Sequence, residues 1–214
     1  MDTIISVIGS QYLQPIADLL GAFLKRKQQK SDAVSSGYYE GAYVSSILLL
    51  LVAVVESMAA RDRHFNVKAR VRRHIPVPEY MKELYRYRGC VRLSELYIIR
   101  DAIIHNHVWV LQFLTSATGK RKLLFAQREW WSGNDRLAQR LNPRTFRTKR
   151  LGLNVIPSRM DRKDLLKAFD VAISFLQFLE KRGVNPVEIL RTTIDFQGTR
   201  ISFLQLRQNL ARGV

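Results

Sequence analysis

ILLLLVAVV, residues 47–55, is an unbroken apolar run, and it decides the fold of this chain. It lies inside a longer segment with helical spacing, residues 38–63, that is apolar on nearly every side. A helix that is apolar all round is typical of a protein centre. We therefore expect this helix to be surrounded by the others.

A membrane span is the alternative interpretation of the same segment. Residues 42–60 approach the roughly 20 mostly apolar residues that a spanning helix needs, but they include three serines and Glu56. A carboxylate is costly in lipid. The sequence thus favours a buried core helix, with a membrane partner as the weaker interpretation.

Further helices flank the central one. Residues 1–24 carry apolar side chains on one helical face, which predicts an amphipathic N-terminal helix, and residues 28–37 form a linker. Asp161 and Gly183 are suited to cap the two ends of an amphipathic helix between them. The other expected helices are residues 79–87, ended by Gly89, residues 93–115, ended by Gly119, and residues 186–190 after Pro186.

These segments predict a mainly α fold, an antiparallel helical bundle with a small irregular or β-containing insertion. The insertion spans about residues 120–157, with candidate short strands at 123–126 and 151–156. The tail is ambiguous, because its residues suit a strand and a helix about equally. The expected organisation is an N-terminal helix in residues 1–30, the bundle in 31–190 and the tail in 191–214.

The charge balance points to polyanionic partners. The chain has 35 Lys and Arg against 18 Asp and Glu, a formal net charge of +17. Such a surplus attracts nucleic acid or an anionic membrane surface. Cys90 is the single cysteine and cannot form an internal disulfide, which fits a reducing cytoplasm. With four histidines besides, a structural zinc site is not expected, and we predict no metal or other cofactor. No basic region precedes the first apolar residues, so we predict no secretory signal and a cytoplasmic location.

A compact set of groups suited to phosphate chemistry lies in RDAIIHNH, residues 100–107. Histidine ionises near neutral pH and can both accept and give a proton in one cycle. Arginine adds a permanently charged planar fork that suits a phosphate oxyanion. The combination indicates phosphodiester chemistry without a metal.

The motif Arg100-Asp101-x-x-x-His105, on a long helix of an all-α bundle, resembles the R-x4-6-H signature of the HEPN superfamily. The resemblance implies a metal-independent endoribonuclease, often a toxin or phage-defence effector, that leaves 2′,3′-cyclic phosphate ends. It implies His105 as general acid and base, Arg100 as the group that stabilises charge on the scissile phosphate, and Asp101 as a positioning residue. It also implies a homodimer that brings two motifs into one cleft, with an antitoxin or activating protein as a further partner.

Helix geometry supports part of this assignment. Asp101 and His105 are four apart and share a face, whereas Arg100 and His105 are about 140° apart around the helix. Arg100 and His107 fall on nearly one line, so His107 is a second-rank candidate, together with Asn106. The structural alternative is a surface salt bridge and a partly buried histidine, in an inactive module that only binds RNA or a partner.

Glu56 has two interpretations. It closes the apolar run and would be a buried structural partner for Arg100 or Arg61, because a buried carboxylate needs a partner. The other interpretation places it at the active cleft. The structural pairing is favoured.

Residues 120–163 form the expected RNA-binding surface. They include thirteen Lys or Arg against three acids, with tryptophans interleaved. Cations along a backbone and flat aromatic faces are typical of single-stranded nucleic-acid binding. The candidate RNA-binding residues are Arg136, Arg140, Arg144, Arg147, Lys149 and Arg150.

Overall fold

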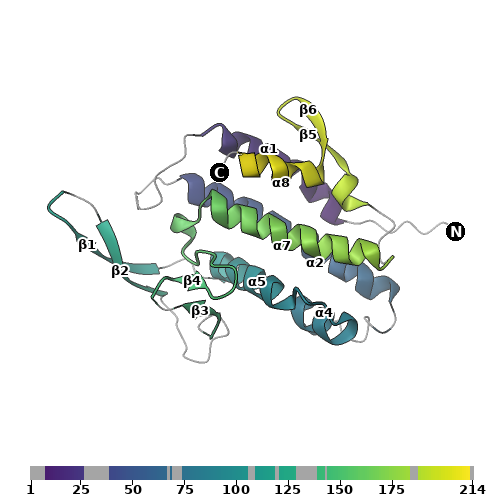
Figure 1. Ribbon diagram of the computed structural model, residues 1–214, viewed down its shortest axis with the longest axis horizontal. Coiled ribbons are helices and arrows are strands. Elements are labelled where there is room, and N and C mark those ends of the chain that lie inside the picture. The colour runs from purple at the N-terminus through teal and green to yellow at the C-terminus, as the bar shows by residue number, and fades with distance from the viewer. Residues whose placement is uncertain are drawn as a thin grey trace.

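The computed structural model describes residues 8–26, 39–66, 68, 74–105, 109–118, 121–128, 139–142, 144–183 and 188–212. The fold is mainly helical, with three small two-stranded antiparallel sheets in the described residues. In Figure 1, α2 (Tyr39–Phe65) and α7 (Arg162–Lys181) occupy the middle of the helical layer. On one side lie α1 (Leu13–Leu24) and α8 (Phe203–Arg212), and on the other α4 (Val77–Tyr85) and α5 (Cys90–His105).

The central position predicted for the apolar helix is confirmed. Ile47, Leu51, Val54 and Val55 of α2 are fully buried, and α2 packs against α1, α5 and α7. By length and composition α2 could cross a membrane, but 56% of its most apolar window is buried inside the fold. Such burial is typical of the core helix of a soluble protein, and it favours that interpretation over a span.

The caps predicted for α7 are present. The Asp161 side chain accepts a hydrogen bond from the Asp164 backbone N–H at 3.0 Å, and the Asp164 side chain accepts one from the Asp161 backbone N–H at 3.2 Å, which completes a capping box. Gly183 follows the helix at φ +66°, a conformation that glycine adopts without strain.

α4 begins two residues earlier than predicted, with Pro78 in its first turn, and ends at Tyr85. The capping residue Arg86 adopts a left-handed conformation with φ 52°. Gly89 therefore does not end the helix. It is required for another reason, because a Cβ at this position would collide with the ring and hydroxyl of Tyr87.

The prediction that the motif helix runs to residue 115 is wrong. α5 ends at His105, and β1 (Trp109–Thr115) pairs antiparallel with β2 (Arg121–Arg128). The sequence WVLQFLT is rich in aromatic and branched side chains that favour strands, and the partner strand satisfies its backbone. β2 covers the strand predicted at residues 123–126.

The second predicted strand, residues 151–156, is also wrong. Asn154 makes a single bridge to Arg147 of β4 (Arg147–Thr148), which pairs with β3 (Leu141–Asn142). Gly152 has φ +65°, and the Asn154 side chain and N–H are bound by Asp164, so no regular ladder forms. The short 3-10 helix η2 (Pro157–Arg159) then leads into α7.

The first and the last described elements of the chain both pack against the bundle. Residues 1–7 and the predicted linker lie outside the described residues, and the N-terminal helix is observed as η1 (Ile8–Tyr12) followed by α1. The tail contains both structures that its sequence suggested, a hairpin of β5 (Thr193–Phe196) and β6 (Thr199–Ser202) and then α8. Gln14 of α1 donates to the Asp195 carbonyl at 2.8 Å and accepts from its N–H at 2.9 Å. Of the short helix predicted at residues 186–190, residues 184–187 lie outside the described part, and the 3-10 helix η3 (Ile189–Arg191) follows.

Candidate functional site

Arg100 lies on α5 where this helix faces α2. Its Nε is 2.9 Å from Asp101 Oδ1, and one of its terminal nitrogens is 3.4 Å from Glu56 Oε1. The Arg100 side chain is 27% exposed, although its Nε is buried, so part of the side chain remains accessible from solvent. Two carboxylates from two helices therefore hold the arginine of the motif in place.

Glu56 pairs with Arg100, as the sequence favoured, but it is not buried. Its side chain is 44% exposed and lies at the rim of the α2–α5 contact. Exposed ion pairs contribute about 0–1 kcal/mol, because water screens the charges and the side chains lose rotamer freedom. The pair therefore orients Arg100 more than it stabilises the fold.

Tyr97 lies beneath Arg100, and the sequence analysis did not identify it. The Arg100 Cζ is 5.3 Å from the centre of the Tyr97 ring, and the residue is only 8% exposed. Its hydroxyl has no hydrogen-bond partner among the described residues. Burial raises the pKa of Tyr97 well above its usual value, and the nearby Glu56 charge raises it further. The hydroxyl is thus a protonated donor beside the Arg100 cluster.

His105 is the last residue of α5. Asp101 and His105 share this helix four residues apart, as expected, and Asp101 also contacts Arg100. The side chain of His105, together with Asn106 and His107, lies outside the described part of the structure. The described portion of the motif is therefore Arg100, Asp101 and their contacts.

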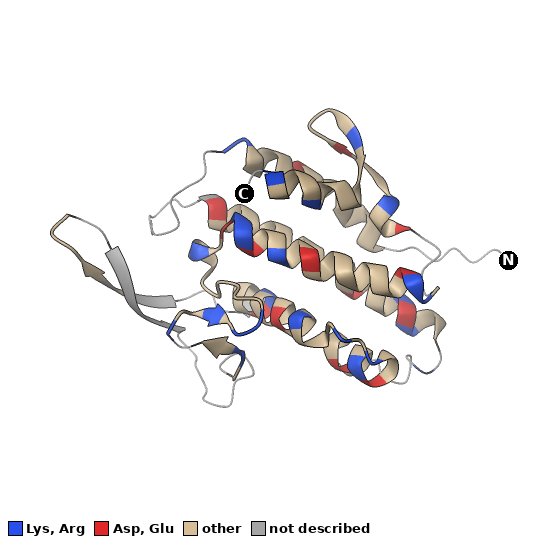
Figure 2. Ribbon diagram, in the orientation of Figure 1, with Lys and Arg blue, Asp and Glu red and all other residues tan. Residues whose placement is uncertain are grey.

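The candidate RNA-binding residues differ in how exposed they are. Arg144, Lys149 and Arg150 are exposed on the loops around β3 and β4, and Arg140 is partly buried. Figure 2 shows basic residues along these loops, beside the end of α5. Arg136 lies outside the described residues.

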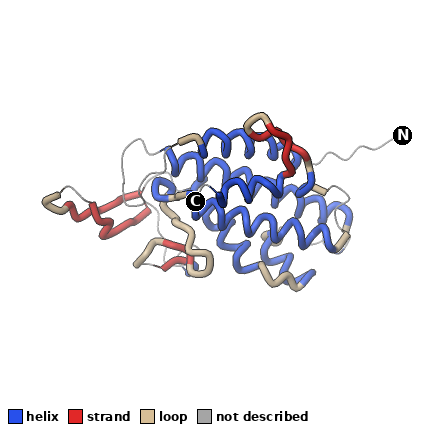
Figure 3. The backbone as a smooth tube through the Cα atoms, turned by 45° about the horizontal axis from the view of Figure 1, so that its top comes forward, coloured by secondary structure: helices blue, strands red, loops and turns tan. Residues whose placement is uncertain are grey.

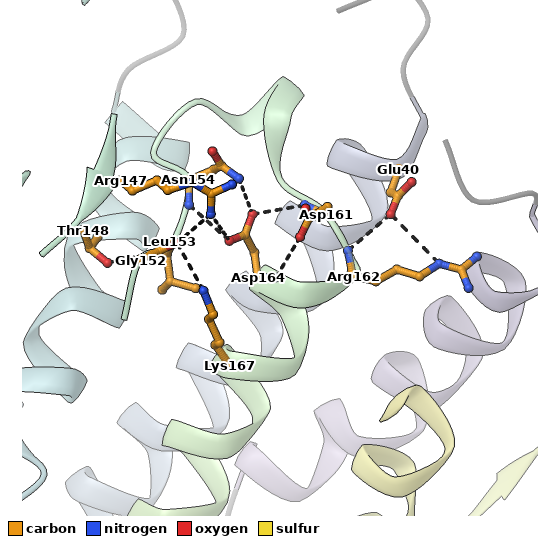
Figure 4. A network of polar contacts seen from close by, with 10 residues as sticks. All are labelled: Glu40, Arg147, Thr148, Gly152, Leu153, Asn154, Asp161, Arg162, Asp164 and Lys167. Atoms are coloured by element: carbon orange, nitrogen blue, oxygen red, sulfur yellow. Dashed lines mark hydrogen bonds and ion pairs between the residues drawn. The ribbon is translucent and has the colours of Figure 1, made fainter. Parts of the chain in front are cut away.

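Arg147 is committed to the fold. It donates to the Gly152 carbonyl at 2.7 Å, and its Nη1 is 3.6 Å from Oδ1 of Asp164, a carboxylate that is 1% exposed (Figure 4). Asp164 also accepts from the Asn154 side chain at 2.7 Å, and burial raises the pKa of Asp164. Arg147 therefore supplies the cation beside a buried carboxylate, and its side chain is still 39% exposed.

The loop that carries Lys149 and Arg150 is anchored by a second buried carboxylate. Glu95 of α5 is completely buried and accepts from the backbone N–H groups of Arg150 at 2.9 Å and Leu151 at 2.7 Å. This contact fixes the basic loop to the helix that carries Arg100.

No group of three or more His, Cys, Asp or Glu residues in the described part of the chain could hold a metal ion. A cavity of about 410 Å³ lies between α1, Tyr43 and the β5–β6 turn, and no residue of α5 lines it. A smaller cavity of about 230 Å³ is lined by Arg92 of α5 and by residues of α7, and Arg100 lines neither of these two cavities.

Comparison of the chain with protein-family models, with curated proteins and with solved structures finds no match. Function must therefore be argued from the residues of the site.

Proposed function

We propose that this chain is a metal-independent endoribonuclease of the HEPN type, with Arg100 and His105 as its catalytic residues. The observation that carries the proposal is the position of Arg100, which is partly accessible from solvent, held by Asp101 and Glu56, and on the helix that ends at His105. A fixed cation five residues before a histidine supplies both of the groups that phosphodiester cleavage requires.

In the proposed reaction His105 takes the proton of a ribose 2′-hydroxyl. The 2′-oxygen attacks phosphorus, and the bond from phosphorus to the 5′-oxygen breaks. Protonated His105 then gives its proton to the leaving 5′-oxygen. Arg100 stabilises the negative charge that develops on the phosphate, and Asp101 positions its neighbours. The products carry a 2′,3′-cyclic phosphate and a 5′-hydroxyl.

Arg100 can reach a phosphate because its contacts are replaceable. The Glu56 contact at 3.4 Å is long for a charge-assisted hydrogen bond, and both partners are partly exposed. A phosphate oxyanion replaces Glu56 at little cost, while Asp101 keeps its contact at 2.9 Å. Exposed Arg144, Lys149 and Arg150 supply further phosphate contacts.

The physiological setting that follows from the resemblance is a toxin or phage-defence effector in the cytoplasm. An antitoxin or an activating protein would then control it. This role as a toxin or defence effector is part of the proposal and requires the ribonuclease activity.

The test uses purified wild type, Arg100→Ala and His105→Ala, each incubated with mixed cellular RNA in EDTA. We expect cleavage by wild type alone, with 2′,3′-cyclic phosphate ends. Equal cleavage by all three proteins would assign the activity to a contaminant and overturn the proposal.

A non-catalytic RNA-binding or partner-binding module is the second candidate. It is favoured by the two carboxylates already on Arg100 and by the exposed cations on the loops. His105→Ala separates the two functions. Lost cleavage with retained RNA binding supports catalysis, and intact RNA with every protein, despite binding, supports the module.

A further inference from the structure

The cavity of about 230 Å³, which we call the α5–α7 cavity, lies between the beginning of α5 and the middle of α7. The two helices pack against each other (Figure 1), and Figure 3 shows the helices side by side with the strands around their outside. The polar side chains that line this cavity are those of Tyr87, Arg92, Lys167, Asp170 and Ser174. Most of its walls are therefore helices of the bundle.

The Tyr87 hydroxyl is a hydrogen-bond donor without an acceptor. Tyr87 is 9% exposed, and the centre of its ring is 4.6 Å from that of Phe178. The hydroxyl lies against Gly89, where a Cβ would collide with it, and it forms no hydrogen bond with a described residue. Burial raises the pKa of Tyr87 to about 12, so the hydroxyl keeps its proton at neutral pH. A ligand in the cavity would supply the acceptor that this donor lacks.

The charged groups of the cavity leave a surplus of positive charge. Arg92 is exposed and forms no ion pair within the described part of the chain. Lys167 donates to the Gly152 carbonyl at 3.3 Å, which is long for a charged donor and leaves its other two N–H groups for a ligand (Figure 4). Asp170 is the one acid among the described lining residues, and Arg207 neutralises it through a contact of 2.8 Å. The cavity is therefore suited to an anion.

The beginning of α5 adds to this preference. The N–H groups in the first turn of a helix carry a positive partial charge, and α5 has no acidic residue in its first turn to offset it. Tyr87 and Arg92 lie on either side of this first turn. The helix terminus, the unpartnered hydroxyl and the two cations thus all favour the same kind of ligand.

The cavity is formed before any ligand binds. Leu151, which lines it, is held by a hydrogen bond of 2.7 Å from its backbone N–H to the buried Glu95 of α5. The Lys167 contact fixes the next residue of the same loop, Gly152. A preformed site does not spend binding free energy on ordering its walls. Its volume lies below the range of about 300–1,000 Å³ that is typical for drug-sized ligands, so the ligand is small.

A phosphate monoester matches this set of donors better than a carboxylate does. It carries a charge of about −1.5 to −2 at neutral pH and three strong acceptor oxygens, which suit two cations and two hydroxyls. A carboxylate has a single charge and two oxygens. A phosphate inside an RNA chain also has a single charge and two free oxygens, so the terminal phosphate of a small molecule is the better fit.

We propose that the α5–α7 cavity binds a small phosphate monoester. Arg92 and Lys167 pair with its phosphate group. The hydroxyls of Tyr87 and Ser174 donate hydrogen bonds to the phosphate oxygens. The organic part of the ligand lies against the apolar side chain of Leu151.

This binding site does not rest on the proposed ribonuclease activity. Arg92 precedes Arg100 on α5 by eight residues, about 12 Å along the helix axis, and Arg100 does not line the cavity. Arg100→Ala should therefore bind the small phosphate as wild type does, even where it cleaves no RNA. Failure of one proposal leaves the other intact.

The test is isothermal titration calorimetry of the full chain with inorganic phosphate and with glycerol 3-phosphate. We expect saturable binding of both probes, with dissociation constants of about 1 mM or lower, and no binding of glycerol. Arg92→Gln should weaken binding about tenfold or more, and Tyr87→Phe about tenfold, because each removes a donor to a charged group. Tyr87→Phe keeps the ring and its packing, so misfolding does not account for its loss of binding.

The matched control is Arg212→Gln, which removes an exposed arginine at the end of α8 and should bind both probes as wild type does. An equal loss in Arg212→Gln and Arg92→Gln would show that net charge alone is responsible and would refute the site. So would the absence of saturable binding of either probe up to about 10 mM. A single-stranded RNA with a 5′-phosphate distinguishes the source of the phosphate. If this RNA binds through Arg92 and glycerol 3-phosphate does not bind, the cavity takes an RNA end and the proposal of a small ligand is wrong.

Discussion

The Arg100 guanidinium lies 3.4 Å from Oε1 of Glu56, and this contact joins the motif helix α5 to the central helix α2. The same guanidinium is 2.9 Å from Asp101. Of the two carboxylates, Glu56 makes the longer contact and belongs to the other helix, so it is the one that a ligand phosphate would displace.

Glu56→Gln should therefore strengthen RNA binding. The substitution removes a competing negative charge and leaves Arg100 held by Asp101. We expect RNA affinity to rise about twofold to fivefold, which is the scale of a partly exposed ion pair. Stability should change by less than about 1 kcal/mol. Fluorescence anisotropy with a labelled single-stranded RNA measures the affinity.

The matched control is Glu188→Gln. Glu188 forms an exposed ion pair of 3.1 Å with Arg191 at the 3-10 helix η3. An equal gain in affinity from Glu188→Gln would show that net charge alone is responsible and would remove Glu56 from the site.

Tyr97→Phe should leave the protein as stable as wild type, or more stable by up to about 1 kcal/mol. The hydroxyl is buried without a partner among the described residues, so its removal ends a desolvation cost while the ring keeps its contact with Arg100. Urea denaturation measures the change. Tyr97→Leu is the comparison, and it should cost about 1–3 kcal/mol because the aromatic contacts are lost. A clear loss of stability in Tyr97→Phe would mean that the hydroxyl has a partner in the folded protein.

Arg144 and Arg147 of the basic loop should differ in two measurements, the salt dependence of RNA binding and the stability of the fold. Arg144→Ala removes an exposed cation, so we expect the slope of log affinity against log salt to fall by about 1 with little change in stability. Arg147→Ala leaves the buried Asp164 without its cation and should cost about 1–3 kcal/mol. RNA titrations at several salt concentrations and urea denaturation provide the two readouts. The assignment fails if Arg147→Ala lowers the salt slope as much as Arg144→Ala and leaves stability unchanged.

Local sequence signals were sufficient to predict the helices α2 and α7, but not to predict where α5 ends. The apolar run in α2 and the Asp161 cap of α7 act within a few residues, so the sequence predicts both. The apolar residues after Asn106 suit a helix and a strand equally, and β1 is fixed by its partner β2, which the helical period does not reveal.

The same distinction holds at the site. The pairing of Glu56 with Arg100 was foreseeable, because Glu56 is the single acid at the end of a long apolar run. Tyr97 gave no signal, since an aromatic residue in an apolar helix is usually a core residue. The ion pair of Arg147 joins it to Asp164, seventeen positions later, and only the folded chain brings the two residues together.

Several buried tyrosines should make the fold sensitive to alkaline pH. Burial raises the pKa of Tyr87 to about 12, and burial together with a hydrogen bond to Asp62 raises that of Tyr85 to about 12. Burial and a hydrogen bond of 2.7 Å to Asp62 raise the pKa of Tyr80 well above its usual value. Asp62 is 1% exposed and accepts from both Tyr80 and Tyr85, so these phenols must stay protonated in the folded state.

In the unfolded chain a phenol ionises near pH 10. Between about pH 10 and 12 the unfolded chain has released these protons and the folded chain still binds them, so the free energy of unfolding falls as pH rises. Below about pH 9 these groups make no pH-dependent contribution. Urea denaturation at intervals from neutral pH to about pH 11 measures the fall, and Tyr87→Phe should reduce its slope because one of the contributing phenols is absent. A slope that is the same in Tyr87→Phe and wild type would show that Tyr87 ionises in the folded state as it does in the unfolded chain.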